Sequence, residues 1–291
     1  MAYLFFKKGR LPITDKQGES LKRVAAALVL IPIVVVAVLY AGAFWLCLAA
    51  SAIILGAVFE YNNFKLTDKR DPLGDALGVG LAVASPFAAF AIGDKALLPV
   101  VIGSTFVFFV QGIVARAGEV KDAALGAALR TLGLVYIALP ITFLFLIAAH
   151  GPRGRLWLLL LLIVIWANDT FAYFTGSLIG KHKLSPEISP GKTVEGALGG
   201  LVGGGMVAYI FNYYVHLETT VYLIIALSIV IGIAGIFGDL AESLLKRSAG
   251  VKDSGSLIPG HGGILDRIDS LLFPAPILYY FILWGIQRLP A

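Results

Sequence analysis

Long apolar runs separated by short polar segments make up most of this chain of 291 residues. An α-helix needs about 20 apolar residues to cross the hydrocarbon core of a bilayer. The pattern therefore predicts an all-α polytopic integral membrane protein. We expect about nine transmembrane helices, at residues 24–41, 43–62, 74–93, 96–115, 124–149, 156–179, 194–215, 219–245 and 266–287. So many spans leave no room for a separate soluble domain, so residues 1–291 are expected to form a single membrane-embedded domain.

The composition agrees with this interpretation. Hydrophobic residues make up 58% of the chain and charged residues only 14%, whereas about a quarter of the residues in soluble proteins are charged. The single cysteine, Cys47, excludes an intrachain disulfide. The N-terminal residues are mixed and basic, and the apolar run after them is long enough to span, so we expect a retained helix rather than a cleaved signal.

The basic residues predict the orientation. The net charge of +5 comes mainly from loops and termini, which favours contact with anionic headgroups over nucleic-acid binding. Lys and Arg concentrate on the cytoplasmic side of membrane proteins. The N-terminus is therefore expected in the cytoplasm, with residues 1–22 as a basic cytoplasmic or interfacial segment. Six basic residues precede the first span: Lys7, Lys8, Arg10, Lys16, Lys22 and Arg23.

Ionisable side chains gather where the eighth predicted span ends. Ionisable groups within spans are costly and mark functional sites or buried partners. The spacing places four residues on one helical face: Asp239, Glu242, Ser243 and Lys246. An i, i+4 pair between Glu242 and Lys246 is a purely structural alternative for that glutamate.

The ninth predicted span begins with two aspartates, Asp266 and Asp269, which are three residues apart and share a helical face. One interpretation is stabilisation of the helix start by the macrodipole. The other is a metal site shared with Asp239, because a cytoplasmic loop can bring the two helix ends together. Carboxylate oxygens suit hard cations, so we expect Mg²⁺ or Mn²⁺ at Asp239, Asp266 and Asp269.

The loop between these helices, SAGVKDSGSLIPGHGGIL, is rich in Gly, Ser and Pro. Such a loop can turn several backbone amides onto an anion, and phosphate is the natural candidate. Its glycines Gly262 and Gly263 follow His261, which could donate to a phosphate or brace the loop. The expected neutralising cations are Lys246, Arg247, Lys252 and Arg267.

A second polar block covers residues 166–196. Asn168 and Asp169 fall within the sixth predicted span, where they need partners or water. The basic loop that follows is expected to bind substrate phosphate through Lys181, Ser189 and Lys192, although attraction to headgroups is an alternative. A Walker-type loop is excluded, because Pro186 occupies the position that requires glycine.

The loop and its flanking helix ends resemble the signature of the phosphatidate cytidylyltransferase (CDP-diacylglycerol synthase) family. The residues that carry the resemblance are Ser243, Lys246, Arg247, Lys252, Asp253, Pro259, His261, Gly262, Gly263, Asp266, Arg267 and Asp269. The segment Asn168–Gly176 and the run SPEISPGKTVEG also resemble this family. The likeness covers residues 160–275, the expected catalytic half, and we identify no specific motif in the N-terminal half.

The resemblance implies that CTP and phosphatidic acid condense to CDP-diacylglycerol and pyrophosphate in a Mg²⁺-dependent reaction of phospholipid biosynthesis. The expected partners are CTP, phosphatidic acid and membrane lipids; a second cation and a homodimer are left open. Asn168 and Asp169 would form the cavity floor or hold the second cation. The site is expected to face the cytoplasm, at the inner membrane if the protein is bacterial.

Two other functions use similar residues. A CTP-dependent kinase of polyprenol-type lipids would use a comparable metal site but release CDP. A cation-coupled transporter would bind its ion at intramembrane carboxylates. The transporter is the weaker alternative, because no internal repeat is evident and Asp266 and Asp269 lie at a helix start.

Overall fold

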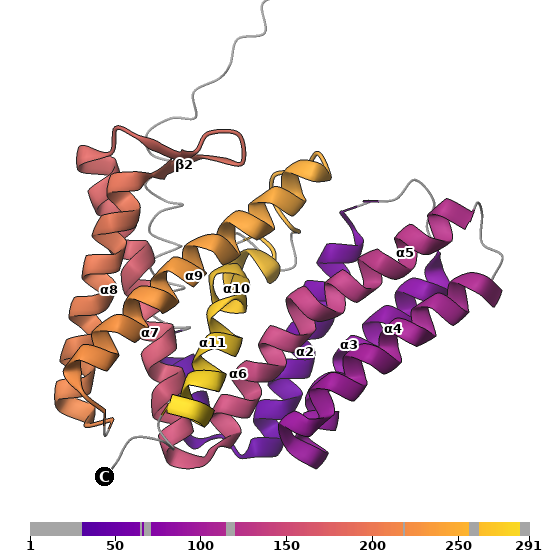
Figure 1. Cartoon of the computed structure of the whole chain (residues 1–291), viewed down its shortest axis with the longest axis horizontal. Coiled ribbons are helices and arrows are strands. Elements are labelled where there is room, and N and C mark those ends of the chain that lie inside the picture. The colour runs from indigo at the N-terminus through magenta and orange to yellow at the C-terminus, as the bar shows by residue number, and fades with distance from the viewer. Residues whose placement is uncertain are drawn as a thin grey trace, which may run out of the picture.

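The computed structural model describes residues 31–64, 66, 71–114, 120–217, 219–255 and 262–285. The predictions for residues 1–22, for the start of the first span and for His261 lie outside these ranges. Within them the regular structure is helical except for one hairpin (Figure 1). The hairpin replaces part of a segment that we expected to be a loop.

The N-terminal half consists of helices joined by short connections. Its elements are a short helix at Ile31–Tyr40, α2 (Ala43–Asn62), α3 (Pro72–Ile92), the 3₁₀ turn η1 (Gly93–Ala96), α4 (Leu97–Val114), α5 (Val120–Gly133), the π-helical turn η2 (Leu134–Ala138) and α6 (Leu139–Ala149). Gly93 takes a positive φ of 71° and ends α3, because glycine has no Cβ to oppose this conformation. The chain can therefore turn back at this point into α4.

The C-terminal half carries most of the predicted site residues. Its elements are α7 (Gly151–Ile179), β1 (Lys183–Ser185), β2 (Ser189–Thr193), α8 (Val194–Val215), α9 (Val221–Ser248), α10 (Leu265–Leu272), α11 (Pro274–Tyr280) and the π-helical turn η3 (Phe281–Gly285). The strands pair antiparallel, with Lys183 opposite Thr193 and Ser185 opposite Ser189. The Thr193 hydroxyl then caps α8 by accepting from the Gly196 amide at 3.1 Å.

Six helical stretches of the described chain are long and apolar enough to cross a membrane. They are Ala43–Asn62, Pro72–Val114, Val120–Ala149, Gly151–Ile179, Val194–Val215 and Val221–Ser248. The second stretch contains both α3 and α4. The molecule is therefore an all-α membrane protein with a multi-pass arrangement. The number of nine spans and the cytoplasmic N-terminus stay predictions.

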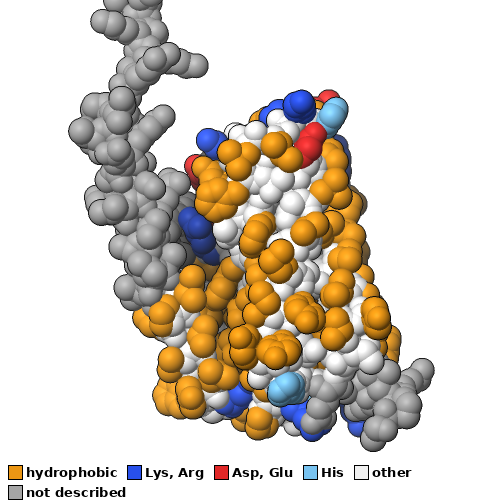
Figure 2. Space-filling model, turned by 90° about the vertical axis from the view of Figure 1, so that its left-hand side faces the viewer, with side chains coloured by type: hydrophobic (Ala, Val, Ile, Leu, Met, Phe, Trp, Pro, Cys, Tyr) orange, Lys and Arg blue, Asp and Glu red, His pale blue; other side chains and the backbone are white. Residues whose placement is uncertain are grey.

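The outer surface of the helices is apolar. Large hydrophobic side chains remain exposed along the described helices, among them Trp45 at 66%, Phe106 at 65% and Leu178 at 80%. On the face in Figure 2, hydrophobic side chains cover the band between the two ends, and charged side chains gather mainly near the ends. This distribution suits contact with lipid between two polar boundaries.

The core lies along the central helical segment Val120–Ala149, whose apolar window is 72% buried, more than that of any other candidate span. Trp157 and Leu161 of α7, Ile54 of α2 and Leu272 of α10 are also buried against the core. In Figure 1, α7, α8 and α9 stand on one side and α2 to α5 on the other, with α10 and α11 between them. Helix α10 thus contacts both halves of the chain.

An ion-pair cluster ties α3, α4 and α5 together. Arg130 of α5 pairs with Asp71 at 2.9 Å and with Asp75 at 3.3 Å, and it donates to Gln111 of α4 at 3.2 Å. Burial raises the pKa of Asp71, but hydrogen bonds from Gly74 and Gln111 and the Arg130 guanidinium outweigh that effect, so its pKa lies below the ordinary value of 3.8. Ionised Asp71 is therefore the form that stabilises the fold.

Replacing Asp71 with Asn should lower the stability of the protein in detergent by about 1–3 kcal/mol at neutral pH, because the charged hydrogen bond and ion pair with Arg130 are lost. The folded-state pKa of Asp71 lies below its unfolded value, so this contribution is present above about pH 4 and is lost as the pH falls through the folded-state pKa. Thermal unfolding of both proteins across the acid range measures the difference.

The same substitution in an Arg130→Met background should cost much less, because the guanidinium is already absent. A stability difference between the wild type and Asp71→Asn that stays constant down to strongly acidic pH would contradict this account.

Candidate active site

A polar cavity of about 500 Å³ lies between α7, the hairpin, α8 and α9. The residues that line it are Asn168, Asp169, Ala172, Tyr173, Gly176, Ser177, Leu184, Gly191, Lys192, Thr193, Gly196, Ala197, Ile236 and Asp239. Lys192 is the one cationic residue in this described lining, and Asp169 and Asp239 are the acidic ones. Four predicted site residues thus meet here from α7, β2 and α9.

Lys192 and Asp239 form an ion pair across this cavity. The Lys192 Nζ lies 2.6 Å from an Asp239 carboxylate oxygen, and both side chains are partly exposed, at 25% and 30%. The Ser243 hydroxyl, one turn further along α9, approaches the other Asp239 oxygen at 3.5 Å. The pair joins the hairpin to α9. It also places an amine and a carboxylate where both can contact a ligand.

Three carboxylates from three helices lie near one another. Asp169 of α7, Asp239 of α9 and Asp269 of α10 are close enough to repel one another electrostatically, and Lys192 opposes the charge on Asp169. Asp269 is 9% exposed, and its oxygen accepts from the Ser270 amide at 2.6 Å and from the Ser270 hydroxyl at 3.1 Å. Concentrated negative charge in a partly buried site favours binding of a cation.

Asn168 lies beneath the cavity and is only 1% exposed. Its Oδ1 has no hydrogen-bond partner among the described residues. A Cβ at Gly200 would lie 2.7 Å from this oxygen and a Cβ at Gly232 would lie 3.2 Å from it, so glycine lets α8 and α9 approach α7 closely. Buried polar atoms almost always have partners. The Asn168 Oδ1, which is unpaired within the described chain, is an exception at the close contact of α7 with α8 and α9.

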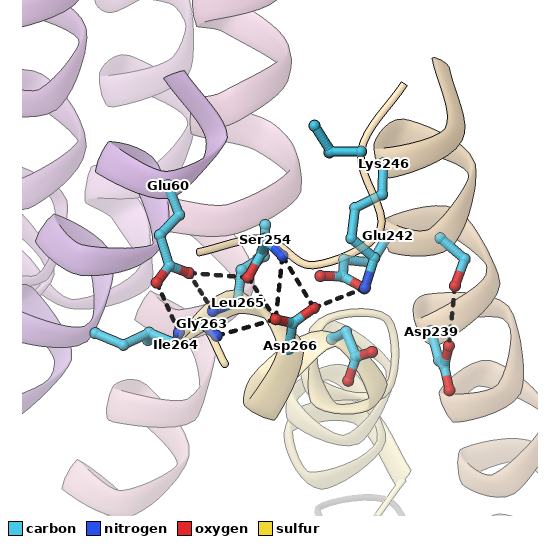
Figure 3. Close-up of polar contacts among 12 residues, drawn as sticks. Glu60, Asp239, Glu242, Lys246, Ser254, Gly263, Ile264, Leu265 and Asp266 are labelled. Carbon is cyan, nitrogen blue, oxygen red and sulfur yellow. Dashed lines mark hydrogen bonds and ion pairs between the residues drawn. The ribbon is translucent and has the colours of Figure 1, made fainter. Parts of the chain in front are cut away.

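Asp266 belongs to a second polar cluster, at the start of α10 (Figure 3). Its Oδ1 accepts from Lys246 Nζ at 2.6 Å. Its Oδ2 accepts from the Gly263 amide at 3.0 Å, and from the amide and hydroxyl of Ser254 at 3.1 and 2.8 Å. Asp266 thus fixes the loop before α10 to the end of α9. The Gly263 amide, which we expected to bind phosphate, is used in this contact.

Lys246 bridges two carboxylates. It pairs with Asp266 and, one helical turn back along α9, with the fully buried Glu242. The contact with Glu242 is the i, i+4 pair that the helical spacing suggests. Lys246 was expected to neutralise substrate phosphate, but its charge is already balanced by two protein carboxylates.

Glu60 is a site residue that the sequence analysis missed. It lies near the end of α2, is 2% exposed, and accepts from the Ile264 amide at 3.0 Å and the Leu265 amide at 2.9 Å (Figure 3). The Ser254 hydroxyl also donates to it at 3.1 Å. The sequence did contain a signal for this role, because Glu60 is a carboxylate within an apolar run. A carboxylate in lipid is energetically costly and needs a partner.

The remaining predicted residues lie around these clusters. Arg247 donates to the Ile188 carbonyl at 3.3 Å and the Val251 carbonyl at 3.1 Å, so it links α9 to the hairpin. Lys252 and Arg267 are exposed. Lys181 is also exposed, and its amide donates to Glu195. Two further predicted residues are partly buried: Ser189 begins β2, and Gly262 takes a positive φ of 82° before α10.

The predicted metal ligands are divided between the two clusters. Asp239 and Asp269 belong to the carboxylate group beside the cavity, and Asp266 belongs to the group around Lys246. Among the described residues, no set of three or more His, Cys, Asp or Glu side chains has the arrangement of a metal site. The metal assignment therefore stays a prediction.

An apolar groove of about 700 Å³ adjoins the polar cavity. The two share Leu184, Ala197 and Ile236 as walls. A further groove of about 440 Å³ lies between α8 and α9, and it shares Leu201 with the apolar groove of about 700 Å³. A polar cavity with charged side chains thus continues into an apolar channel on the side of the molecule formed by α8 and α9.

Replacing Gly263 with Ala should destabilise the loop, because the new Cβ would collide with the Ser254 hydroxyl and with Glu60 Oε2. Overpacking of this kind costs about 1–3 kcal/mol, so the thermal unfolding midpoint in detergent should fall. The matched control is Gly103→Ala in α4, where a Cβ would meet nothing within 4 Å. Equal midpoints for both variants would contradict the tight contact.

Comparison with known proteins gives consistent matches. A family model described as the cytidylyltransferase family matches residues 21–284. The phosphatidate cytidylyltransferase of Bacillus subtilis (strain 168) is 43% identical over 152 residues, which are 52% of this chain and 56% of that protein. The phosphatidate cytidylyltransferase of Staphylococcus haemolyticus (strain JCSC1435) is also 43% identical over 152 residues, 52% of this chain and 57% of that protein.

A longer match is found with the phosphatidate cytidylyltransferase of Staphylococcus aureus (strain COL). It is 31% identical over 261 residues, which are 89% of this chain and 96% of that protein. The chain therefore aligns with little more than half the length of the first two relatives and with nearly the whole of the third.

Proposed function

Because the chain belongs to the cytidylyltransferase family, we propose that it is a phosphatidate cytidylyltransferase. It condenses CTP with phosphatidic acid to give CDP-diacylglycerol and pyrophosphate. The observation that carries the proposal is the polar cavity with Asp169, Lys192 and Asp239, which shares its walls with an apolar groove. A reaction between a nucleotide and a lipid headgroup needs both surfaces side by side.

The lipid substrate enters from the bilayer in this proposal. Its phosphate reaches the cavity near Lys192, and its acyl chains lie in the apolar groove of about 700 Å³ that adjoins the cavity. Exposed apolar side chains such as Leu198, Phe237 and Leu244 line that groove. Keeping the chains in an apolar environment avoids a cost of about 0.8 kcal/mol per CH₂ transferred into water.

In the proposed reaction, a phosphate oxygen of phosphatidic acid attacks the α-phosphorus of CTP. A new P–O bond forms, the bond from the α-phosphorus to the bridging oxygen breaks, and pyrophosphate leaves with that electron pair. The lipid phosphate is already anionic, so a strong general base is unnecessary. Catalysis then consists mainly of positioning and charge neutralisation. Lys192 is the cation best placed for this role, because it faces the cavity.

The family resemblance implies Mg²⁺, and the side chains near the cavity fit a hard cation. Asp169, Asp239 and Asp269 supply carboxylate oxygens, which a hard cation prefers, and they are close enough to repel one another electrostatically. Asp239 and Asp269 would hold the ion, and Asn168 and Asp169 would bind a second cation. When bound, the metal neutralises and orients the triphosphate.

Asp266, the third predicted ligand, has a competing role. Both of its oxygens accept hydrogen bonds from Lys246, Ser254 and Gly263. Metal binding by Asp266 would require one of these contacts to be exchanged. We therefore centre the proposed site on Asp239 and Asp269, and assign Asp266 to holding Lys246 and the start of α10 beside it.

The proposed topology has nine spans, a cytoplasmic N-terminus and a cytoplasmic active site within a single membrane-embedded domain. Support for this orientation comes from the basic residues near the site, including Lys181, Lys192, Arg247 and Lys252. CTP is a cytoplasmic nucleotide, so this orientation gives the cavity direct access to it. A homodimer is compatible with the proposal but is not needed for it.

The decisive experiment incubates purified protein with radiolabelled CTP, phosphatidic acid in mixed micelles and Mg²⁺. The expected products are CDP-diacylglycerol, which carries the label into the lipid phase, and one equivalent of pyrophosphate. Release of CDP with a phosphorylated lipid would replace the proposal with a lipid kinase. No lipid product at all with either phosphatidic acid or a polyprenol would contradict enzymatic action on these lipids.

Replacing Asp239 or Asp269 with Asn should lower kcat at least about 100-fold, because groups that stabilise charge in the transition state act at this scale. The substitution preserves size, so the variants should still fold in detergent. The control is Asp75→Asn, which removes a carboxylate from the Arg130 cluster outside the site. Turnover near that of the wild type in both site variants would remove the carboxylates from the mechanism.

A further inference from the structure

We propose that Glu60 of α2 is a positioning residue for the reaction. It fixes the start of α10 and the loop residue Ser254, so that the aspartates of α10 keep their places beside the cavity. The proposal rests on the proposed function. It assigns a role in the site to the N-terminal half, in which the sequence analysis identified no specific motif.

The first contact is between Glu60 and the backbone of α10. Its two oxygens accept separately from consecutive amides, Oε1 from Ile264 at 3.0 Å and Oε2 from Leu265 at 2.9 Å. The preceding amide, that of Gly263, donates to Asp266 at 3.0 Å. The first amides of a helix have no partner within the helix, and negative charge is stabilising there. Two carboxylates therefore accept from the three consecutive amides that lead into α10.

The second contact is with Ser254. Its hydroxyl lies 3.1 Å from Glu60 Oε2 and 2.8 Å from Asp266 Oδ2. A hydroxyl has a single proton, so the two carboxylates share it. Asp266 in turn binds Lys246. A continuous polar chain thus runs from α2 through the loop to α10 and α9 (Figure 3).

The loop is built closely around the Glu60 carboxylate. A Cβ added at Gly255 would lie 2.8 Å from Glu60 Oε1, and a Cβ added at Gly263 would collide with Oε2. Only backbone without a side chain fits at these two positions. The described ends of the loop, at Ser254, Gly255 and Gly263, therefore lie directly against the Glu60 carboxylate where α10 begins.

The cost of this arrangement argues for a role beyond stability. Helices are normally capped by a residue next to their own first turn, whereas Glu60 reaches α10 across 204 positions in the sequence. A buried carboxylate needs full compensation by hydrogen bonds. Asp269 lies on the same eight-residue helix, so any displacement of the helix start moves it relative to Asp239.

The test replaces Glu60 with Gln, which keeps the shape but turns one acceptor oxygen into a donor that faces an amide. Loss of a residue that orients the groups around a site typically costs about 10- to 100-fold in activity. We expect kcat for CDP-diacylglycerol formation to fall by that factor. KM for CTP should change less than about twofold, because Glu60 is not among the residues that line the cavity.

The matched control is Asp71→Asn, which removes another carboxylate that caps a helix, away from the site. Its thermal midpoint should fall while kcat stays within about twofold of wild type.

Hydrogen exchange gives a readout that needs no turnover: the Ile264 and Leu265 amides should exchange faster in Glu60→Gln than in wild type. Ser254→Ala should lower kcat less in the Glu60→Gln background than alone, because both act through one network.

Unchanged kcat in folded Glu60→Gln would overturn the proposal. So would equal losses of kcat in Glu60→Gln and Asp71→Asn that follow their thermal midpoints, because Glu60 would then contribute only stability. A wild-type protein that forms no CDP-diacylglycerol would refute the proposed function itself, and the role of Glu60 in it.

Discussion

The central constraint on this molecule is the cost of carboxylates inside an apolar helical bundle. A charged group away from water is tolerated only when hydrogen bonds and opposite charges compensate it. Glu60 and Asp266 meet this requirement with partners from α9, α10 and the connecting loop. The buried Glu242 has an ion pair with Lys246, but its oxygens have no hydrogen-bond partner among the described residues. Because the partners of Glu60 and Asp266 come from other parts of the chain, their hydrogen bonds and the ion pair also fix how these elements meet.

Asp169, Asp239 and Asp269 are compensated less completely. Lys192 is their nearby cation, and the three carboxylates remain close to one another. Glu60 and Asp266 accept several hydrogen bonds each, so we assign them a structural role, and we assign the chemical role to the carboxylates beside the cavity. Glu60 and Asp266 hold the start of α10, and in the proposed function the carboxylates beside the cavity bind cations while Lys192 binds phosphate. In the same proposal, the adjoining apolar groove accommodates the acyl chains of the lipid substrate.

Sequence patterns and the structure agree best along the helices. Apolar runs are long and local, so the predicted segment at residues 43–62 coincides with α2, and the segment at 194–215 coincides with α8. The hairpin was missed because Pro186, Pro190 and Gly191 are typical of a loop. Its strands, KLS and SPGKT, have only three and five residues. They are too short and too polar to show the alternation of apolar and polar residues that predicts a strand.

The sequence by itself determined the all-helical membrane architecture and the helical face that carries Asp239, Glu242 and Lys246, because both follow from periodicity within one segment. It also contained the family signature. Only the tertiary structure decided which charges meet: Lys246 with Asp266, Lys192 with Asp239, and Glu60 with the start of α10. Such partners lie on separate helices, and their pairing depends on how the helices pack, which no local pattern encodes.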